Sequence, residues 1–243
     1  MSKSESEYPA VAGEFEKHFK EGVYRAIYSR RDIRSQFRSD PIPEEVLARI
    51  LHAAHHAPSV GFMQPWNFIL VEALEIRKTI HAAFERANAE ATLMFSEEKR
   101  EQYQSFKLEG ILESPLNICI TCDRSRFGPV VIGRTANRAM DIFSSVCAVQ
   151  NLWLAARAEG LGVGWVSILH NRNLLKILNL PRHVVPVAYL CVGYVTHFPP
   201  APELETAGWL PRLSLEELVF CNQWGNRCQT TWPKLYEAMC LNR

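Results

Sequence analysis

Apolar residues recur at helical and strand spacings along most of the chain. A helix is predicted at about 23–29, and a second follows Pro43 with its apolar residues on one face. Residues 140–159 are apolar nearly all round, so this helix should be central and buried, with Gly160 placed to end it. The remaining predictions are strands at 67–71, 116–122, 163–169 and 184–194, and a short helix at 171–179. The order predicts an α+β fold with a sheet covered by helices, but it does not give the strand order.

Two segments have no packing partner that the apolar pattern identifies. Residues 74–112 are long, polar and helical in composition, which predicts one or two helices. They form either a lid, assigned to 84–112, or a solvated hairpin. The last fifty residues have aromatic anchors but little core, so they either wrap around a partner subunit or pack on their own domain. These anchors are Phe198, Trp209, Phe220 and Trp224. We therefore expect a flexible segment at 1–20 and a single domain at 21–243, of which 195–243 is the dimer-wrapping tail.

Composition narrows the class of protein. The chain has 243 residues, 47% of them hydrophobic, and a formal net charge of +1. This length supports one substantial core, and the charge balance argues against nucleic acid or a membrane surface as a partner. Residues 1–9 do not resemble a signal peptide, and the richest apolar stretch, 140–156, is interrupted by Asp141. We expect a soluble, cytoplasmic protein.

The seven cysteines include one CxxC pair, Cys119 and Cys122. Such a pair can bind zinc or carry redox chemistry. Here it lies in a predicted strand, where residues three apart point to opposite faces and converge poorly on a metal. No second pair completes a site. We therefore predict no metal centre and interpret the cysteines as reduced thiols, most of them small buried hydrophobic residues.

Three arginines lie within five residues in Arg30–Arg34, with Asp32 at the centre. Their guanidinium groups could bind a phosphate through bidentate hydrogen bonds, or the run could be a solvated charge cluster. If the run is helical, Arg30 and Arg34 share a face, which favours a binding role.

A rigid turn is predicted within Ala57–Phe68, because this segment contains two prolines and a glycine between a helix and a strand. Gln64 and Asn67 offer amide groups suited to the edge of a heteroaromatic ring. Further along, Gly160–Ser167 contains three glycines that would let the backbone approach a planar ligand. Its spacing is not GxGxxG, and it follows a helix and enters a strand, which argues against a Rossmann nucleotide site.

Together these segments resemble the nitroreductase-type FMN family. The features that match are Arg30–Arg34, Ser59–Trp66, Gly162–Ser167 and Arg212, although Leu210 stands where the family often has Lys or Arg. A more specific resemblance, spanning about 24–224, is to the BluB branch of 5,6-dimethylbenzimidazole synthases. It rests on 30–34, 57–68, 107–110, 119–124, 133–135, 146–159 and 162–168. The resemblance implies a central, mostly antiparallel sheet flanked by helices and a homodimer with an exchanged C-terminal extension.

The resemblance also implies an activity. Reduced FMN would be a substrate that reacts with O2 and is fragmented to 5,6-dimethylbenzimidazole and erythrose 4-phosphate, and it would come from a flavin reductase or as free reduced flavin. Asp32 replaces the family's usual hydroxyl and would act as a base on the ribityl chain, held ionised by its arginine neighbours, while Ser167 would hydrogen-bond near the ring. The implied FMN contacts are Arg30, Arg31, Asp32, Ile33, Arg34, Pro58, Ser59, Met63, Gln64, Leu108, Gly164, Trp165, Val166, Ser167 and Arg212. The alternatives are an NAD(P)H-dependent nitroreductase that recycles FMN and a non-enzymatic flavin-binding protein.

Overall fold

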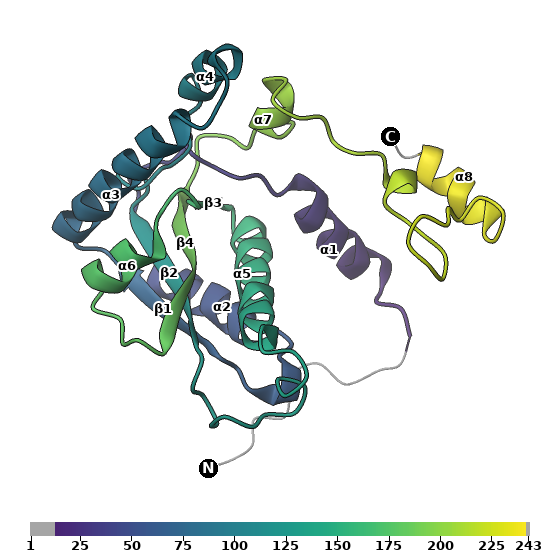
Figure 1. Ribbon diagram of the computed structural model, residues 1–243, viewed down its shortest axis with the longest axis horizontal. Helices are drawn as coiled ribbons and strands as arrows, with labels where there is room; N and C mark the ends of the chain where they lie inside the picture. Colours follow the sequence, from purple (N-terminus) through teal and green to yellow (C-terminus); the bar gives the residue numbers. More distant parts are fainter. Residues whose placement is uncertain (1–12, 242–243) are drawn as a thin grey trace. The chain divides into compact units, whose positions relative to one another are not determined.

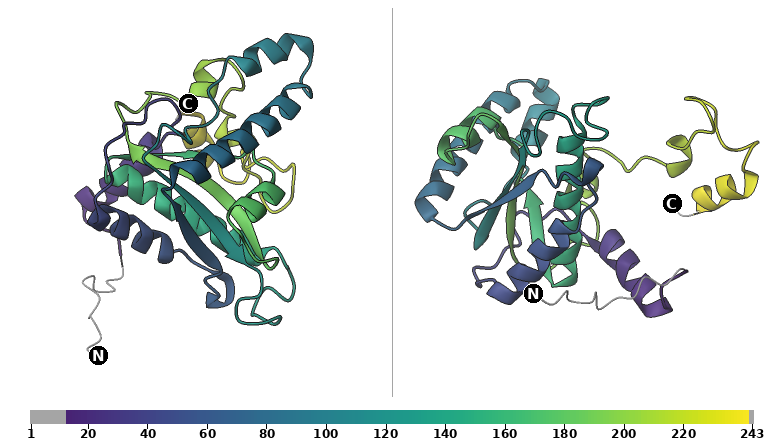
Figure 2. Two further views of the ribbon diagram at one scale, coloured as in Figure 1. Left: turned by 90° about the vertical axis from the view of Figure 1, so that its left-hand side faces the viewer. Right: turned by 90° about the horizontal axis from the view of Figure 1, so that it is seen from below.

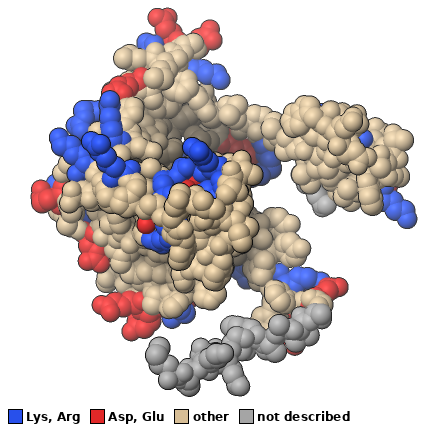
Figure 3. Space-filling model, turned by 60° about the horizontal axis from the view of Figure 1, so that its bottom comes forward, with Lys and Arg blue, Asp and Glu red and all other residues tan. Residues whose placement is uncertain are grey.

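The computed structural model describes residues 13–241, and its contacts divide the chain into two compact units, Met1–Phe198 and Pro199–Arg243. Most of the predicted flexible segment 1–20 lies outside the described residues. Its last four residues belong to helix α1, which spans Lys17–Ser29 and so begins six residues before the predicted helix. Acidic and basic side chains both occur on the face seen in Figure 3, in keeping with the net charge near zero.

An antiparallel sheet of four strands, in the order β1-β2-β4-β3, is the centre of the first unit (Figure 1). Its strands are β1 (Trp66–Val71), β2 (Leu116–Asp123), β3 (Leu161–Trp165) and β4 (Val184–Tyr194). The α+β class and the antiparallel sheet are therefore confirmed. The third strand was predicted to reach residue 169, but pairing with β4 ends at Trp165.

Helices cover both faces of this sheet (Figure 2). On one face, α2 (Glu44–His55) and α5 (Met140–Ala158) form a core with Ile118, Leu152 and Leu190. On the other face, α3 (Leu74–Thr92) and α6 (Asn171–Ile177) contribute to a second core. That core contains Ile80, Phe84, Ile111, Cys119, Leu174, Tyr189 and Cys191. The sheet is thus packed between two apolar clusters, one on each face.

Helix α5 is central, as its composition predicted, but it is not buried all round. Leu152 is fully buried, whereas Phe143 is 52% exposed and Val146 is 37% exposed. The segment at 74–112 forms two helices, α3 and α4 (Glu97–Gln104), which project together from the sheet in Figure 1. Gly160 follows α5 with a φ of +79°, the left-handed conformation that ends helices.

The predicted orientation of the CxxC pair is confirmed, because its two thiols face opposite sides of the sheet. Cys119 lies in the core with α3, whereas Cys122 contacts Ser145 of α5. Burial raises the pKa of the Cys119 thiol to about 12 and that of Cys122 to about 11. No group of side chains that could hold a metal ion occurs within 13–241.

The second unit contains α7 (Glu203–Thr206), the 3-10 turn η2 (Leu215–Glu217) and α8 (Pro233–Leu241). Here the interpretation of all cysteines as reduced thiols was wrong, because Cys221 and Cys228 form a disulfide. A backbone bridge between Phe220 and Arg227 lies next to the two cysteines, whose Cα atoms are 5.4 Å apart. The spacing of the cysteines in the sequence did not reveal this proximity. Among helices of residues 13–241, none is long and apolar enough to cross a membrane.

Candidate active site

The Arg30–Arg34 segment lies along the outer edge of the sheet, beside strand β3. Asp32 forms a parallel bridge with Val163, and the backbone N–H of Ile33 donates to the Val163 carbonyl at 3.0 Å. The Ile33 side chain is fully buried, so the one apolar residue of the run anchors it. Because α1 ends at Ser29 and Arg30 is extended, the helical arrangement considered for these arginines does not occur.

Two glycines of β3 permit this close approach. A Cβ on Gly164 would lie 2.0 Å from the Ile33 carbonyl oxygen, and one on Gly162 would lie 2.9 Å from the Ile33 side chain. The sequence analysis assigned these glycines to a planar ligand. In the structure the space beside them is filled by the protein's own Ile33, so their first role is to position the Asp32 segment.

The Asp32 carboxylate is held from two sides. Its Oδ1 accepts a hydrogen bond of 3.0 Å from the backbone N–H of Trp165, and its Oδ2 pairs with the Arg34 guanidinium at 2.5 Å. The Arg34 side chain is only 12% exposed, so the ion pair is partly shielded from solvent. This geometry fixes the Asp32 carboxylate beside the end of β3.

The three guanidinium groups differ in their surroundings. Arg31 donates to the carbonyls of Tyr28 and Arg30 at 2.9 and 2.7 Å, and Arg34 pairs with Asp32. The Arg30 guanidinium lies 5.2 Å from the ring centre of Trp153. Within the described residues the Nε of Arg30 is buried and has no hydrogen-bond partner, an arrangement that suits an anionic ligand.

A small cavity lies beside Asp32. Its empty space is about 140 Å³, and its lining joins the arginine segment, the end of β3 and the segment after α4. The lining residues are Asp32, Ile33, Arg34, Leu108, Glu109, Gly110, Gly164, Trp165 and Val166. Seven of the predicted FMN contacts are thus brought together, while Glu109 and Gly110 were not among them. The sequence pointed to this segment through Leu108 and through the resemblance at 107–110, but it did not place Glu109 or Gly110 at the site.

The predicted turn at 58–64 is strained, as a ligand cradle often is. Gly61, Phe62 and Gln64 all have positive φ values, of 60°, 51° and 42°. The turn includes the 3-10 helix η1 (Val60–Phe62). The hydroxyl of Ser59 accepts from the Gln64 N–H at 3.1 Å. These bonds hold the backbone of the turn in a defined shape.

Arg126 supports this turn and was missed by sequence reasoning. Its guanidinium donates to the carbonyls of Gln64 and Trp66 at 2.7 and 3.1 Å, and to the amide oxygen of Asn67 at 2.6 Å. The Asn67 amide is therefore used within the protein and not held open for a ring edge. Met63 is also fully buried, so it anchors the turn to the protein interior. A loop arginine gives no periodic signal by which its partner could be found.

The two groups of predicted site residues lie toward opposite ends of helix α5. The turn is tied to Ser144, whose hydroxyl accepts from the Val60 N–H at 3.1 Å. The arginine segment is tied to Trp153, whose indole N–H donates to the Arg31 carbonyl at 3.3 Å. Nine residues separate these anchors, or about 14 Å along a helix. One subunit therefore does not gather both groups around one small cavity.

Ser167 and Arg212 lie outside the cavity lining. Ser167 is exposed just beyond β3. Arg212 is exposed in the second unit, where its backbone N–H donates to Glu205 at 3.4 Å. Their roles in binding FMN stay predictions.

The sequence pattern of the nitroreductase family matches residues 27–194, so the chain belongs to the nitroreductase family. Two relatives lie in one branch of that family. The chain is 42% identical to the 5,6-dimethylbenzimidazole synthase of Rhodospirillum rubrum over 82% of this chain and 93% of that protein. It is 36% identical to the protein of that name from Rhodobacter capsulatus, over 83% and 97%.

Solved structures share the fold at lower identity. An iodotyrosine deiodinase bound to FMN and 3-iodo-L-tyrosine is 22% identical, with a TM-score of 0.64 over 84% of this chain and 99% of that one. NfrA2 of B. megaterium is 18% identical, with a TM-score of 0.64 over 91% and 85%. These likenesses confirm the nitroreductase-like fold.

Proposed function

We propose that this chain is a 5,6-dimethylbenzimidazole synthase. It fragments reduced FMN in a reaction with O2 and releases erythrose 4-phosphate from the ribityl phosphate. The relatives named for this activity support it, since they match more than four fifths of both chains. The structural observation that carries the proposal is Asp32, a carboxylate fixed beside the end of β3 where the family's usual residue is a hydroxyl.

The residues around Asp32 fit a flavin mononucleotide. The buried Nε of Arg30 lacks a protein partner and suits a phosphate oxygen, with Trp153 fixing the guanidinium from one side. The exposed edges of Trp165 and Leu108 provide apolar walls next to Asp32. Bound reduced FMN supplies the electrons that O2 accepts, and Arg212 contributes a further phosphate contact.

A second copy of the chain completes the site. The cavity beside Asp32 is a narrow gap with no room for a water-sized molecule, so one copy of the chain does not form a complete flavin pocket there. The turn at 58–64 lies toward the other end of α5. Phe143 and Val146 on α5 and Phe62 on the turn are exposed apolar residues that a partner would cover. We infer a homodimer in which each of two flavins contacts Arg30–Arg34 of one subunit and the turn of the other, with the C-terminal tail wrapping around the partner.

The proposed chemistry assigns a role to Asp32, to Ser167 and to the segment 84–112. Asp32 removes a proton from the ribityl chain, because it is a carboxylate fixed at that end of the cavity. Ser167 hydrogen-bonds near the oxygen-reactive part of the ring. Residues 84–112 cover the site and exclude water. Reduced FMN arrives from a separate flavin reductase or as free reduced flavin.

Incubating the protein with reduced FMN in air tests the proposal against its alternatives. Formation of 5,6-dimethylbenzimidazole supports it. Simple return to FMN, with rapid bleaching of bound FMN by NADH or NADPH under anaerobic conditions, identifies a flavin-recycling nitroreductase. Tight binding of flavin with no change in its rate of oxidation identifies a non-enzymatic carrier. A covered site predicts slow or no reduction by either nucleotide.

A further inference from the structure

Glu109 is a buried carboxylate that the proposed chemistry does not use. Its side chain is 4% exposed, and it lines the cavity beside Asp32. Its Oε2 accepts the backbone N–H of Ile111 at 2.7 Å, and its Oε1 accepts from the ammonium of Lys107. A buried carboxylate is costly unless it is paired in this way, so Glu109 holds its own segment in one conformation.

Lys107 also pairs with Glu113 at 2.7 Å, so one ammonium group links two carboxylates of the segment. We call the ion-pair cluster of Lys107, Glu109 and Glu113 the clasp. Burial lowers the pKa of Lys107, but its hydrogen bonds to Glu109 and Glu113 outweigh that effect and raise the pKa above its ordinary value. Burial raises the pKa of Glu113, but the Lys107 hydrogen bond, a backbone hydrogen bond and the nearby positive charge of Lys107 together outweigh burial and leave the pKa lowered. Lys107 and Glu113 therefore pair as charged groups at neutral pH.

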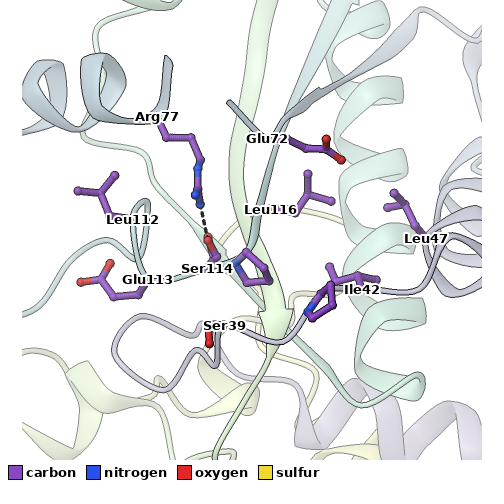
Figure 4. A pocket seen from close by; sticks show the side chains of 11 residues that line it. Ser39, Ile42, Leu47, Glu72, Arg77, Leu112, Glu113, Ser114 and Leu116 are labelled. Carbon is purple, nitrogen blue, oxygen red and sulfur yellow. Dashed lines mark hydrogen bonds between the residues drawn. The ribbon is translucent and has the colours of Figure 1, made fainter. Parts of the chain in front are cut away.

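Helix α3 contacts segment 107–114 through side chains on one of its faces. Arg77 and His81 are four residues apart and so share a face of the helix. The Arg77 guanidinium donates to the carbonyl of Ser114, as Figure 4 shows. One turn further on, His81 Nε2 lies 3.8 Å from Glu109 Oε1. The segment from 107 to 114 is therefore held against the base of the projecting hairpin of α3 and α4.

The other side of the segment contacts the arginine run. A Cβ on Gly110 would lie 2.7 Å from the Arg34 carbonyl oxygen and 2.7 Å from the Phe37 ring, so backbone meets backbone here. Arg34 in turn pairs with Asp32. An unbroken series of contacts runs from α3 through Glu109 and Gly110 to Asp32.

We propose that Glu109 is a positioning residue that locks segment 107–113 in place as one wall of the flavin cavity. The Glu109 carboxylate links the hairpin of α3 and α4 to the cavity. The hairpin and segment 107–113 then act jointly to retain the bound flavin. The inference rests on the proposed function only in placing flavin in this cavity. Loosening the wall admits water and lets the flavin leave, without removing any group that touches the reacting atoms.

Glu109→Gln tests this role, because the amide oxygen still accepts the Ile111 N–H while the charge that pairs with Lys107 is lost. We expect FMN to dissociate about tenfold faster, the usual scale for losing a charge-assisted hydrogen bond. Amide hydrogens in 107–113 should exchange faster, and the melting temperature should change little. The ratio of peroxide to benzimidazole should rise. Glu75→Gln is the matched control, since it weakens the exposed Lys78–Glu75 pair on α3, which lies outside the cavity lining and outside segment 107–113, and its FMN dissociation rate should stay near that of the wild type.

Lys107→Met removes the ammonium group that pairs with Glu109 and Glu113. If Glu109→Gln does not fold, this variant tests whether Glu109 positions segment 107–113. Faster FMN release with faster exchange in 107–113 supports the proposal. FMN release at the wild-type rate, or unchanged exchange in the segment, overturns it. Both readouts are independent of product formation. A wild-type protein that makes no benzimidazole would therefore refute the proposed function while leaving the positioning role to be judged by FMN release.

Discussion

The Asp32 carboxylate accepts a hydrogen bond of 3.0 Å from the backbone N–H of Trp165, across the outer edge of the sheet. Its other oxygen pairs with Arg34 at 2.5 Å. The residue proposed as a base therefore also ties the arginine run to β3. A carboxylate oxygen can accept more than one hydrogen bond, so the two roles are compatible, and experiments must separate them.

Asp32→Asn should separate catalysis from binding. The amide oxygen can keep the Trp165 hydrogen bond, but the side chain no longer accepts a proton as a carboxylate does. The variant should bind reduced FMN and react with O2, and then release FMN and peroxide. We expect product formation to fall by about 10²–10⁴-fold, the range typical of general acid–base catalysis. Flavin affinity and product yield are measured on the same preparation.

Ser167→Gly is the companion variant, with a milder loss of product because it removes a hydrogen bond and not a proton acceptor. If Asp32 only orients Arg34, the asparagine variant would bind FMN more weakly and still form product at a near-normal rate when saturated. That result would refute the assigned role of Asp32.

Arg30→Ala should weaken FMN binding by about 1–3 kcal/mol, because the buried Nε is assigned to the phosphate. Titration calorimetry of FMN and of riboflavin, which lacks the phosphate, measures the effect. Riboflavin should bind the wild-type protein poorly. Its affinity should change little in Arg30→Ala, because it has no phosphate for Arg30 to contact. Arg38→Ala is the control, since Arg38 pairs with Asp40 at 2.8 Å near the surface. Equal binding of FMN and riboflavin to the wild type would show that Arg30 holds no phosphate.

Phe143→Asp should disrupt the dimer, because Phe143 is 52% exposed on α5 in one subunit. Loss of about 1.5–3 kcal/mol of apolar burial in each subunit raises the dissociation constant by roughly 10²–10⁴-fold. Light scattering over a dilution series measures it, and FMN affinity should fall in parallel. Ile76→Asp on α3, which covers the other face of the sheet, is the control. A wild-type monomer at micromolar concentration that still binds FMN would contradict the composite site.

Stability should fall in alkali because three buried thiols resist ionisation. Burial raises the pKa of Cys119 and Cys191 to about 12 and that of Cys122 to about 11, from an ordinary value of 9.0. The folded state therefore binds more protons than the unfolded state above about pH 9. Their stabilisation is complete below that pH and is lost as pH rises toward 11 and 12, by up to about 1.4 kcal/mol per pH unit for each thiol.

Urea unfolding between pH 7.5 and pH 10.5 checks this slope, and Cys119→Ala should reduce it by about a third. An unfolding free energy that does not change across this range would show that the thiols are not buried as described.

The sheet and its covering helices were predictable because their apolar periodicity depends only on neighbouring residues. Strand β4 was predicted to the residue, and the opposite facing of Cys119 and Cys122 followed from the alternation of a strand. Burial of α5 was overestimated, since an apolar composition does not show which faces of a helix pack on the core. Phe143 of this helix is 52% exposed.

The contacts that shape the site were less accessible to sequence reasoning. Gly164 was noticed, but its neighbour proved to be the Ile33 backbone and not a ligand. The pairing of Arg126 with the Gln64 carbonyl, and that of Cys221 with Cys228, joins residues whose separation in the sequence carries no pattern. Such contacts depend on how the chain returns on itself, which local periodicity does not encode.

The central claim is that this chain destroys the flavin it binds. A single-turnover reaction with limiting reduced FMN and dissolved O2, separated by chromatography, measures it directly. The account predicts that most of the flavin is converted to 5,6-dimethylbenzimidazole, with erythrose 4-phosphate in equal amount, and that Asp32→Asn returns FMN and peroxide. Quantitative recovery of FMN from the wild-type protein, with no benzimidazole formed, would contradict it.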